Sequence, residues 1–211
     1  MKILINRTDA IGDTILTMPM AQYIGEKYPQ SKIIFLVSPR SAPLLLHHPW
    51  ISDVWIIPNN RSWFVQLVFL LKRILNEKLD AYFYVGGTHL PSFICWLLRI
   101  KIRGGIKSRW PAFLFLNNGV RQKRSMVEMH EAEYNLNLLK CLDINYHYLD
   151  RDKVPSQIFL TSDEILLGKN TLNDLWSKDK STSAANLPYI VIHPGMRGHT
   201  LNWPAKNYAR F

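Results

Sequence analysis

Short apolar runs alternate with longer amphipathic segments over the first hundred residues of this chain. Met1–Asn6, Lys32–Val37 and Ala81–Val85 are almost continuously apolar, which is typical of strands buried on both faces of a sheet. Between them, Thr14–Lys27 and Trp63–Glu77 carry apolar residues at helical spacing. Strands that alternate with helices predict βαβ units with right-handed crossovers. We therefore expect an α/β fold, a mostly parallel sheet with helices on both of its faces.

Further elements follow from the same patterns. They are two strands and three helices, at Asp53–Ile57, Lys101–Gly104, Ser41–His47, Ser92–Leu98 and Glu128–Cys141. Thr161–Glu164 is an N-capping signal for a helix that ends near Trp176, and a polar linker follows it. Tyr189–Ile192 then predicts the first strand of a second α/β unit, with Trp203–Phe211 as its first helix. The expected organisation is a domain at 1–160, a helix and linker at 161–187, and the start of a second domain at 188–211.

The charge of the chain points to an anionic partner or to a solvated basic surface. Lys and Arg number 26 against 16 Asp and Glu, a net charge of +10. Lys101–Arg124 concentrates seven of these cations without an acid, and it fits a ligand-facing patch as well as a solvated face. The two cysteines, Cys95 and Cys141, lack CxxC spacing and are expected to be small buried hydrophobic residues. We find no secretory signal and no membrane-spanning run, and we expect a cytoplasmic protein.

The segment after the first strand contains the candidate site. Ligands of open α/β sheets bind beyond the carboxyl ends of the strands, and Asp13 is predicted there. Asp13 fits a catalytic carboxylate, and it also fits a helix N-cap. Gly12 would supply backbone freedom at the turn. The forked guanidinium group of Arg7 is suited to bind an anionic ligand, and it is also suited to form an ion pair with Asp9 or Asp13. The chain has no GxGxxG, GxxxxGK[ST], HExxH or GxSxG motif, which disfavours the enzyme classes that these motifs mark.

At this point the sequence resembles a known family. Arg7-x-Asp9-x-Ile11-Gly12-Asp13, followed by Leu16-Thr17-x-Pro19, is similar to the start of the ADP-heptose:lipopolysaccharide heptosyltransferases of glycosyltransferase family 9. Four later segments resemble that family in the same order: Leu79–Tyr82, Arg103–Gly105, His130–Leu139, and Val191–Gly195 with Asn202–Pro204. The first motif is fairly specific, and the others add weight mainly by their order.

The resemblance implies a GT-B fold, in which two Rossmann-like domains face each other across a cleft. It implies an inverting, metal-independent transfer of heptose from a nucleotide sugar, ADP-heptose, to a lipopolysaccharide core acceptor at the cytoplasmic face of the inner membrane. Residues 1–160 would bind the acceptor. Asp13 would be the base, and Arg7, Asp9 and Gly12 would contact the acceptor. The donor phosphates would lie against residues of the second domain: Gly195, Met196, Arg197 and Thr200. No metal, cofactor or nucleic acid is expected.

Two features depart from the family. Leu201 stands where heptosyltransferases often have a lysine before the Trp-Pro pair, which leaves the donor sugar open. Family members also continue for about 150 more residues, the size of a typical domain. We therefore expect the chain to be an incomplete fragment with little transferase activity alone. The alternative function is a non-catalytic basic module for an anionic membrane surface or nucleic acid. An apolar set on one predicted helix is expected to be core in preference to membrane-inserted residues: Trp63, Phe64, Leu67, Phe69, Leu70 and Leu71. Together with Lys72, Arg73 and the Lys101–Arg124 patch, the set also fits peripheral contact with an anionic bilayer.

Overall fold

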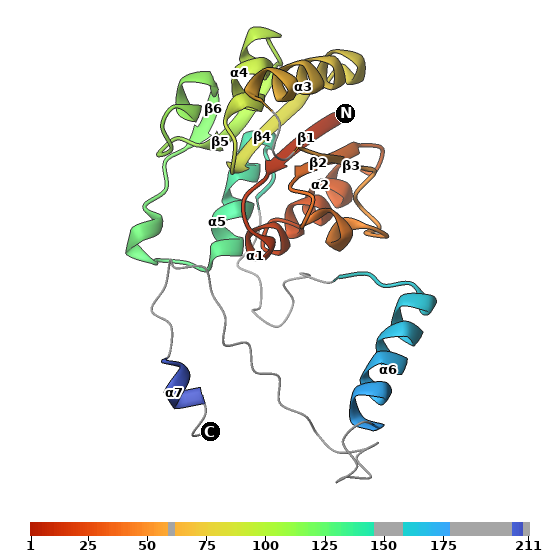
Figure 1. Cartoon of the computed structure of the whole chain (residues 1–211). Helices are drawn as coiled ribbons and strands as arrows, with labels where there is room; N and C mark the ends of the chain where they lie inside the picture. The colour runs from red at the N-terminus through yellow and green to blue at the C-terminus, as the bar shows by residue number, and fades with distance from the viewer. Residues whose placement is uncertain (59–61, 146–157, 178–203, 209–211) are drawn as a thin grey trace. The chain divides into compact units, whose positions relative to one another are not determined.

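The computed structural model of this protein describes residues 1–58, 62–145, 158–177 and 204–208 (Figure 1). The chain forms two compact units, Met1–Thr161 and Ser162–Phe211. The first unit contains the whole sheet and every described residue of the predicted site. No helix among the described residues is long and apolar enough to cross a membrane.

The first unit is built on a six-stranded sheet in which every pair of neighbouring strands is parallel. The strands are β1 (Lys2–Arg7), β2 (Lys32–Val37), β3 (Asp53–Ile56), β4 (Ala81–Gly86), β5 (Ile102–Ile106) and β6 (Asn118–Val120). Their order across the sheet is β3-β2-β1-β4-β5-β6. The chain winds outward from β1 in one direction and then returns to start β4 on its other side. This reversal creates the switch point at which doubly wound sheets bind ligands.

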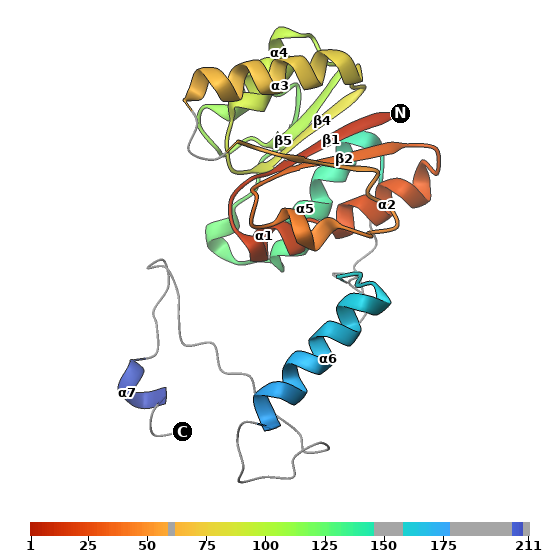
Figure 2. The same ribbon diagram turned by 45° about the vertical axis from the view of Figure 1, so that its right-hand side comes forward.

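Helices cover both faces of the sheet, as the sequence predicts (Figures 1 and 2). One face carries α1 (Ile11–Ile15), α2 (Pro19–Lys27), α5 (Glu131–Asn137) and the 3-10 helices at Ala42–Leu45 and Leu138–Leu142. The other carries α3 (Trp63–Glu77), α4 (Leu90–Leu97) and the 3-10 helix η2 at Ala112–Phe115. Successive strand residues place their side chains on opposite faces of the sheet: Ile3 and Ile5 pack toward α2, whereas Leu4 packs toward α3. The α/β fold class is therefore confirmed.

Several predicted elements differ in detail. The helix predicted at Thr14–Lys27 is two helices, because Pro19 has no N–H to continue the first one and starts α2 instead. The helix predicted from Glu128 begins at Glu131, where His130 and Glu133 form a reciprocal capping box. The strand β6 and the 3-10 helix η2 were not predicted from the sequence.

The second unit contains α6 (Ser162–Ser177) and α7 (Ala205–Tyr208). The helix α6 confirms the one predicted from the N-capping signal, and α7 lies within the predicted segment Trp203–Phe211. The strand predicted at Tyr189–Ile192 lies outside the described residues. The linker predicted after Ser177 also lies outside them.

Candidate functional site

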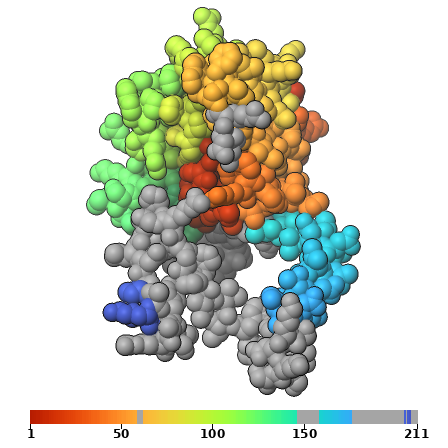
Figure 3. Space-filling view, in the orientation of Figure 1, coloured from red at the N-terminus to blue at the C-terminus, as the bar shows by residue number. Residues whose placement is uncertain are grey.

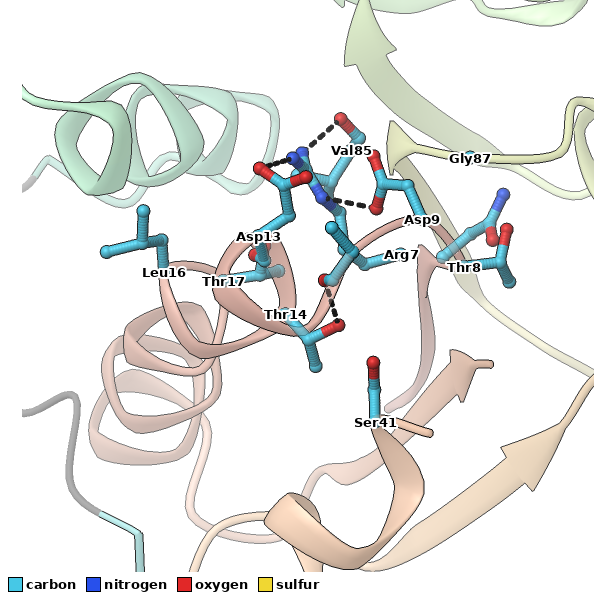
Figure 4. A network of polar contacts seen from close by, with 12 residues as sticks. Arg7, Thr8, Asp9, Asp13, Thr14, Leu16, Thr17, Ser41, Val85 and Gly87 are labelled. Atoms are coloured by element: carbon cyan, nitrogen blue, oxygen red, sulfur yellow. Dashed lines mark hydrogen bonds and ion pairs between the residues drawn. The ribbon is translucent and has the colours of Figure 1, made fainter. Parts of the chain in front are cut away.

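The predicted site lies at the carboxyl end of β1, beside the end of β4. Figure 4 shows Arg7 from the end of β1, Asp9 from the following turn and Asp13 from α1 gathered around one guanidinium group. In the space-filling view, the red atoms of this N-terminal segment reach the surface between the orange and green parts of the chain (Figure 3). The structure therefore brings together Arg7, Asp9, Gly12 and Asp13, the four described residues that the sequence assigned to the site.

Arg7 is the buried centre of this cluster. Its side chain is 5% exposed, its Nη1 donates a hydrogen bond to the Val85 carbonyl at 2.8 Å, and its Nη2 lies 2.6 Å from Oδ1 of Asp13. Its Nε lies 2.8 Å from Oδ1 of Asp9, an ion pair without hydrogen-bond geometry. The ion-pair alternative for Arg7 is thus the arrangement observed, and the guanidinium contacts both carboxylates at once. Direct binding of an acceptor group by Arg7 stays a prediction.

Asp13 is not the N-cap of its helix. The N-cap of α1 is Ala10, which has extended backbone angles and no side-chain cap, and Asp13 is the third helical residue. The Asp13 side chain is 34% exposed and one oxygen contacts Arg7. A carboxylate in the first turn of a helix still gains from the helix dipole. The structure therefore removes the capping explanation for Asp13 and leaves a partly exposed, oriented carboxylate.

Gly12 has a different role from the one predicted. It is helical and its φ is not positive, so the backbone does not need a glycine at this position. A Cβ built on Gly12 would have no heavy atom within 4 Å. The absence of a side chain at this exposed position therefore leaves open surface immediately before Asp13. A substrate group could approach the Asp13 carboxylate across it.

The loop after β4 closes one side of the site, and the sequence reasoning did not identify it. Gly87 has a φ of +81°, and a Cβ there would lie 2.1 Å from Oγ1 of Thr8. That same hydroxyl oxygen accepts a hydrogen bond from the Thr88 backbone N–H at 2.8 Å. A side chain on Gly86 would collide with Asp9 at 2.7 Å. The Gly86-Gly87 pair after a buried strand is the signal that could have identified this close contact.

A buried polar network lies beneath the site. Asn6, which is 0% exposed, donates from Nδ2 to the Thr88 carbonyl at 2.7 Å and to the Tyr82 hydroxyl at 3.1 Å. The Tyr82 hydroxyl in turn lies 2.8 Å from Oγ of Ser92. Oδ1 of Asn6 has no hydrogen-bond partner among the described residues. The network links the end of β1 to the β4 loop and to α4, and so it fixes the distance between the two loops of the site.

A second network ties the opposite side of the site to α5. Asn135, also 0% exposed, donates to the Leu16 carbonyl at 2.9 Å and to Oγ1 of Thr17 at 3.2 Å. Thr17 donates from the same hydroxyl to the backbone carbonyl of Asp13 at 2.8 Å. Oδ1 of Asn135 accepts from Arg124, which also pairs with Glu131. The turn between α1 and α2, and with it Asp13, is therefore held by a residue more than a hundred positions away.

Charged groups of both signs lie near the site. Burial raises the pKa of Asp9, and the positive charge of Arg7 opposes that rise. Burial lowers the pKa of the Arg124 guanidinium, and Arg7 and Arg109 add to this effect. The pKa of Tyr84 is raised by burial, and its hydroxyl donates to the Gly87 carbonyl at 3.1 Å. Three guanidinium groups, those of Arg7, Arg109 and Arg124, therefore lie in a partly dehydrated setting near the carboxylates of Asp9 and Asp13.

The predicted basic patch is only partly a surface feature. Arg103 donates from Nε to the Phe115 carbonyl at 2.8 Å, and Arg124 is held by Glu131 and Asn135. By contrast, Lys101, Lys107 and Arg109 are exposed. Arg103 and Arg124 thus stabilise the local fold, whereas the exposed members can meet a ligand.

Other residues considered in the sequence analysis lie outside this site or outside the described residues. The predicted donor-phosphate residues Gly195, Met196, Arg197 and Thr200 lie outside the described residues. His48 is buried, its pKa is lowered by that burial, and its Nδ1 accepts the Trp50 backbone N–H at 3.3 Å. Cys95 is buried, as predicted, whereas the same prediction for Cys141 is wrong, because Cys141 is only half-buried and its thiol donates to the Asn118 carbonyl. Within the described ranges no cluster of His, Cys, Asp or Glu is suited to hold a metal ion.

Comparisons with known proteins fit this fold. No family model matches the chain. Over 99% of its length the chain is 26% identical to a Haemophilus influenzae protein described as a "Putative glycosyltransferase", and it covers 58% of that protein. Among solved structures it is similar to a family 9 glycosyl transferase from Veillonella parvula, with a TM-score of 0.64, 17% identity and coverage of 87% of this chain and 50% of the other.

A second solved structure is the Escherichia coli ADP-heptose LPS heptosyltransferase II. It matches with a TM-score of 0.61 and 15% identity over 87% of this chain and 52% of that enzyme. The chain thus spans about half the length of the proteins it is compared with here. The resemblance to family 9 glycosyltransferases that the sequence motifs indicated is confirmed.

Proposed function

We propose that this chain supplies the acceptor-binding part of a glycosyltransferase. The reaction is the transfer of heptose from ADP-heptose to a lipopolysaccharide core acceptor, with inversion at the anomeric carbon and without a metal. The observation that carries the proposal is the Asp13 carboxylate at the switch point, held by buried Arg7 and bordered by open surface at Gly12. The likeness to a family 9 structure and to a heptosyltransferase structure supports the choice of reaction.

The chemistry requires a base at this position. Asp13 takes the proton of an acceptor hydroxyl while that oxygen attacks the anomeric carbon from the face opposite the leaving diphosphate. Arg7 contacts Oδ1 of Asp13, and we assign the other oxygen to the acceptor hydroxyl. Arg7 acts here as a positioning residue, because its buried fork fixes the rotation of the carboxylate. The exposed cations Lys107 and Arg109 attract the anionic acceptor toward the edge of the sheet.

The remaining assignments belong to the same proposal. Residues 1–160 form the acceptor-binding domain, residues 161–187 a helix and linker, and residues 188–211 the start of the donor-binding domain. Helix N-termini and basic groups stabilise a departing diphosphate, a role that we assign to the donor-phosphate residues named above. The protein would work in the cytoplasm, at the inner face of the membrane that carries its acceptor.

The test is a transfer assay on Asp13→Asn, with Asp9→Asn as its matched control. Both carboxylates contact the same guanidinium, and both side chains are about one third exposed (35% and 34%). Each substitution therefore removes one charge from Arg7 at similar structural cost. If Asp13 is the base, its variant loses about 10²–10⁴-fold in rate at saturating acceptor, the usual worth of general base catalysis, whereas the Asp9 variant, which changes a predicted acceptor contact, loses acceptor affinity and keeps most of its saturated rate.

The assay needs the protein with a complete donor-binding domain, because transfer requires the donor held in line with the acceptor. ADP-heptose consumption and the melting temperature are measured together. Equal rate losses in the two variants would show that the carboxylates only support Arg7. Full activity in Asp13→Asn would overturn the assignment of Asp13 as the base, whereas no transfer by the unchanged protein would favour the alternative, a non-catalytic basic module.

A further inference from the structure

The helix α3 has apolar residues on two opposite sides. Its inner side packs on the sheet through Leu70 and Ile74, which are at most 1% exposed. The opposite stripe also consists mainly of apolar residues, and these are exposed: Phe64 by 59%, Val65 by 40%, Val68 by 48% and Leu75 by 51%. A surface helix of a globular domain normally turns charged and polar residues outward. The expectation that Trp63 and Phe64 are core is therefore wrong, since Trp63 itself is 70% exposed, whereas Leu70 is core as expected and Leu67, Phe69 and Leu71 pack against that core.

The apolar surface continues onto the neighbouring elements of the same layer. On α4, Trp96 and Leu97 are 47% and 56% exposed, and they line a cavity of about 300 Å³ together with Arg99 and Arg103. Next to α4, the segment around η2 exposes Trp110 by 75% and Leu114 by 53%. Figures 2 and 3 show α3 and α4 side by side as the outer layer on this side of the sheet. An exposed apolar area spread over several elements marks an interaction surface.

The charge of the layer is strongly positive. The helices α3 and α4, the 3-10 helix η2 and the turns next to them carry two acids, Glu77 and Asp80, and the cations Lys72, Arg73, Lys78, Arg99, Lys107 and Arg109. Both acids are engaged at the amino edge of the sheet: Glu77 pairs with Lys2 and Lys32, and Asp80 accepts the Lys2 backbone N–H at 2.7 Å. On the outer side, Lys72, Arg73 and Arg99 are exposed among the apolar residues. The surface therefore suits a partner that is apolar and anionic.

We infer that the outer surface of α3, α4 and η2 docks on an anionic lipid bilayer. Aliphatic side chains such as Val68, Leu75 and Leu97 suit acyl chains and do not stack on bases, which disfavours nucleic acid. A second copy of the chain would bring like charges together, which disfavours self-association. Tryptophan rings and basic side chains between apolar residues are the composition that settles at a membrane interface. Lipid headgroups would neutralise the cations while Phe64 and its neighbours enter the headgroup–acyl boundary.

Docking on this surface would also bring the bilayer near the site. The helix α3 follows β3, and α4 follows β4, so both helices begin at the carboxyl edge of the sheet, where Asp13 lies. Trp110 follows β5 and lies on the same edge. The most exposed aromatic residues are thus at the end of the layer next to the site. This placement does not depend on the transfer reaction, so a failed transfer assay would leave the docking proposal standing.

The test is flotation of the 211-residue chain with lipid vesicles. Vesicles of equal parts phosphatidylglycerol and phosphatidylethanolamine are compared with vesicles of phosphatidylcholine. We expect the chain to float with the anionic vesicles only. The double variant Phe64→Ser with Val68→Ser is expected to bind at least about tenfold more weakly, since two buried apolar side chains are lost. Lys72→Glu is expected to weaken binding about fivefold or more.

Matched controls lie on the opposite face of the sheet. Leu46→Ser removes an apolar side chain of 47% exposure, and Lys140→Glu makes the same charge change as Lys72→Glu at an exposed position. Both controls are expected to bind like the unchanged chain, and circular dichroism checks that every variant is folded. Equal binding by the α3 variants and their controls would overturn the proposal, as would no flotation with anionic vesicles. A dimer that the α3 substitutions dissociate, or retention on single-stranded RNA in place of vesicles, would also overturn it.

Discussion

The helices α2 and α3 lie on opposite faces of one sheet and differ in what they present outward. On the inner side α2 buries Met20, Ala21 and Ile24, each at 0% exposure, just as α3 buries Leu70 and Ile74. On its outer side α2 carries polar residues, and Gln22 donates to Glu26 at 2.7 Å. The outer side of α3 carries Phe64 and other exposed apolar residues instead. Packing on the sheet explains why the inner residues of both helices are apolar. It does not explain the exposed apolar residues on the outer side of α3, which α2 lacks.

The two faces also differ in how they are held to the sheet. The α2 side is joined to α5 by buried hydrogen bonds from Asn135, and these bonds end at the turn next to Asp13. On the other face, α4 is joined to the sheet by the hydrogen bonds of the Tyr82 hydroxyl with Asn6 and Ser92, whereas α3 itself packs through apolar residues, with ion pairs between Glu77 and two lysines at its end. A turn that positions the proposed base gains from hydrogen bonds of fixed geometry. A helix that packs through apolar residues alone lacks them, and this difference between α2 and α3 can be tested by substitution.

The largest expected effect separates the inner and outer residues of α3. Leu70→Ala is expected to lower the free energy of unfolding by about 2–5 kcal/mol, because it leaves a cavity in a packed core. Val68→Ala, two positions earlier on the same helix, is expected to change it by less than about 0.5 kcal/mol. Urea unfolding followed by circular dichroism measures both. A cost for Val68→Ala close to that for Leu70→Ala would mean that the outer stripe is covered within the protein itself.

Next in size is the loss of the polar link on the α2 side. Asn135→Ala leaves the Leu16 carbonyl and an Arg124 donor without their partner in a buried place, which costs about 1–3 kcal/mol. Gln22→Ala, which removes an exposed hydrogen bond on the outer side of α2, is the control and should change the unfolding free energy by less than about 0.5 kcal/mol. Equal changes in the unfolding free energy would show that the buried hydrogen bonds of Asn135 stabilise the fold no more than an exposed hydrogen bond does.

Much of the fold could be predicted from the sequence, because its strands and long helices have local signals. The bounds of β2 and α3 agree with the prediction, since an unbroken apolar run marks the strand and apolar residues at helical spacing mark the helix. The break before Pro19 was missed, because the apolar spacing continues across it. The strand β6 is three residues long and includes Gly119, so its pairing with β5 decides its conformation.

The site could be predicted only in part for a similar reason. Arg7 and Asp13 flank one strand end, so their proximity follows from the local order of strand, turn and helix. The contacts of Thr8 with Thr88, and of Asn135 with Thr17, depend on which strands and helices are neighbours. Strand order is a property of the assembled sheet, and no local pattern records it. The exposure of Trp63 and Phe64 was missed because helical spacing reports an apolar stripe and not the depth at which it is buried.

The smallest expected effect concerns the polar contact that ends α3. The hydrogen bond from Lys32 lowers the pKa of Glu77 below its usual value of 4.5, and Lys2 adds to this. Because the folded-state pKa is the lower one, the charged carboxylate stabilises the fold above the unfolded-state pKa. This contribution is lost as the pH falls through the folded-state pKa.

Glu77→Gln should therefore cost about 0.5 kcal/mol at neutral pH, as exposed pairs do, and almost nothing in strong acid. Urea unfolding at several pH values, in a double-mutant cycle with Lys32→Gln, measures it. A pH-independent cost would show that Glu77 acts by packing, and a cost as large as that of Asn135→Ala would remove the contrast between the two faces.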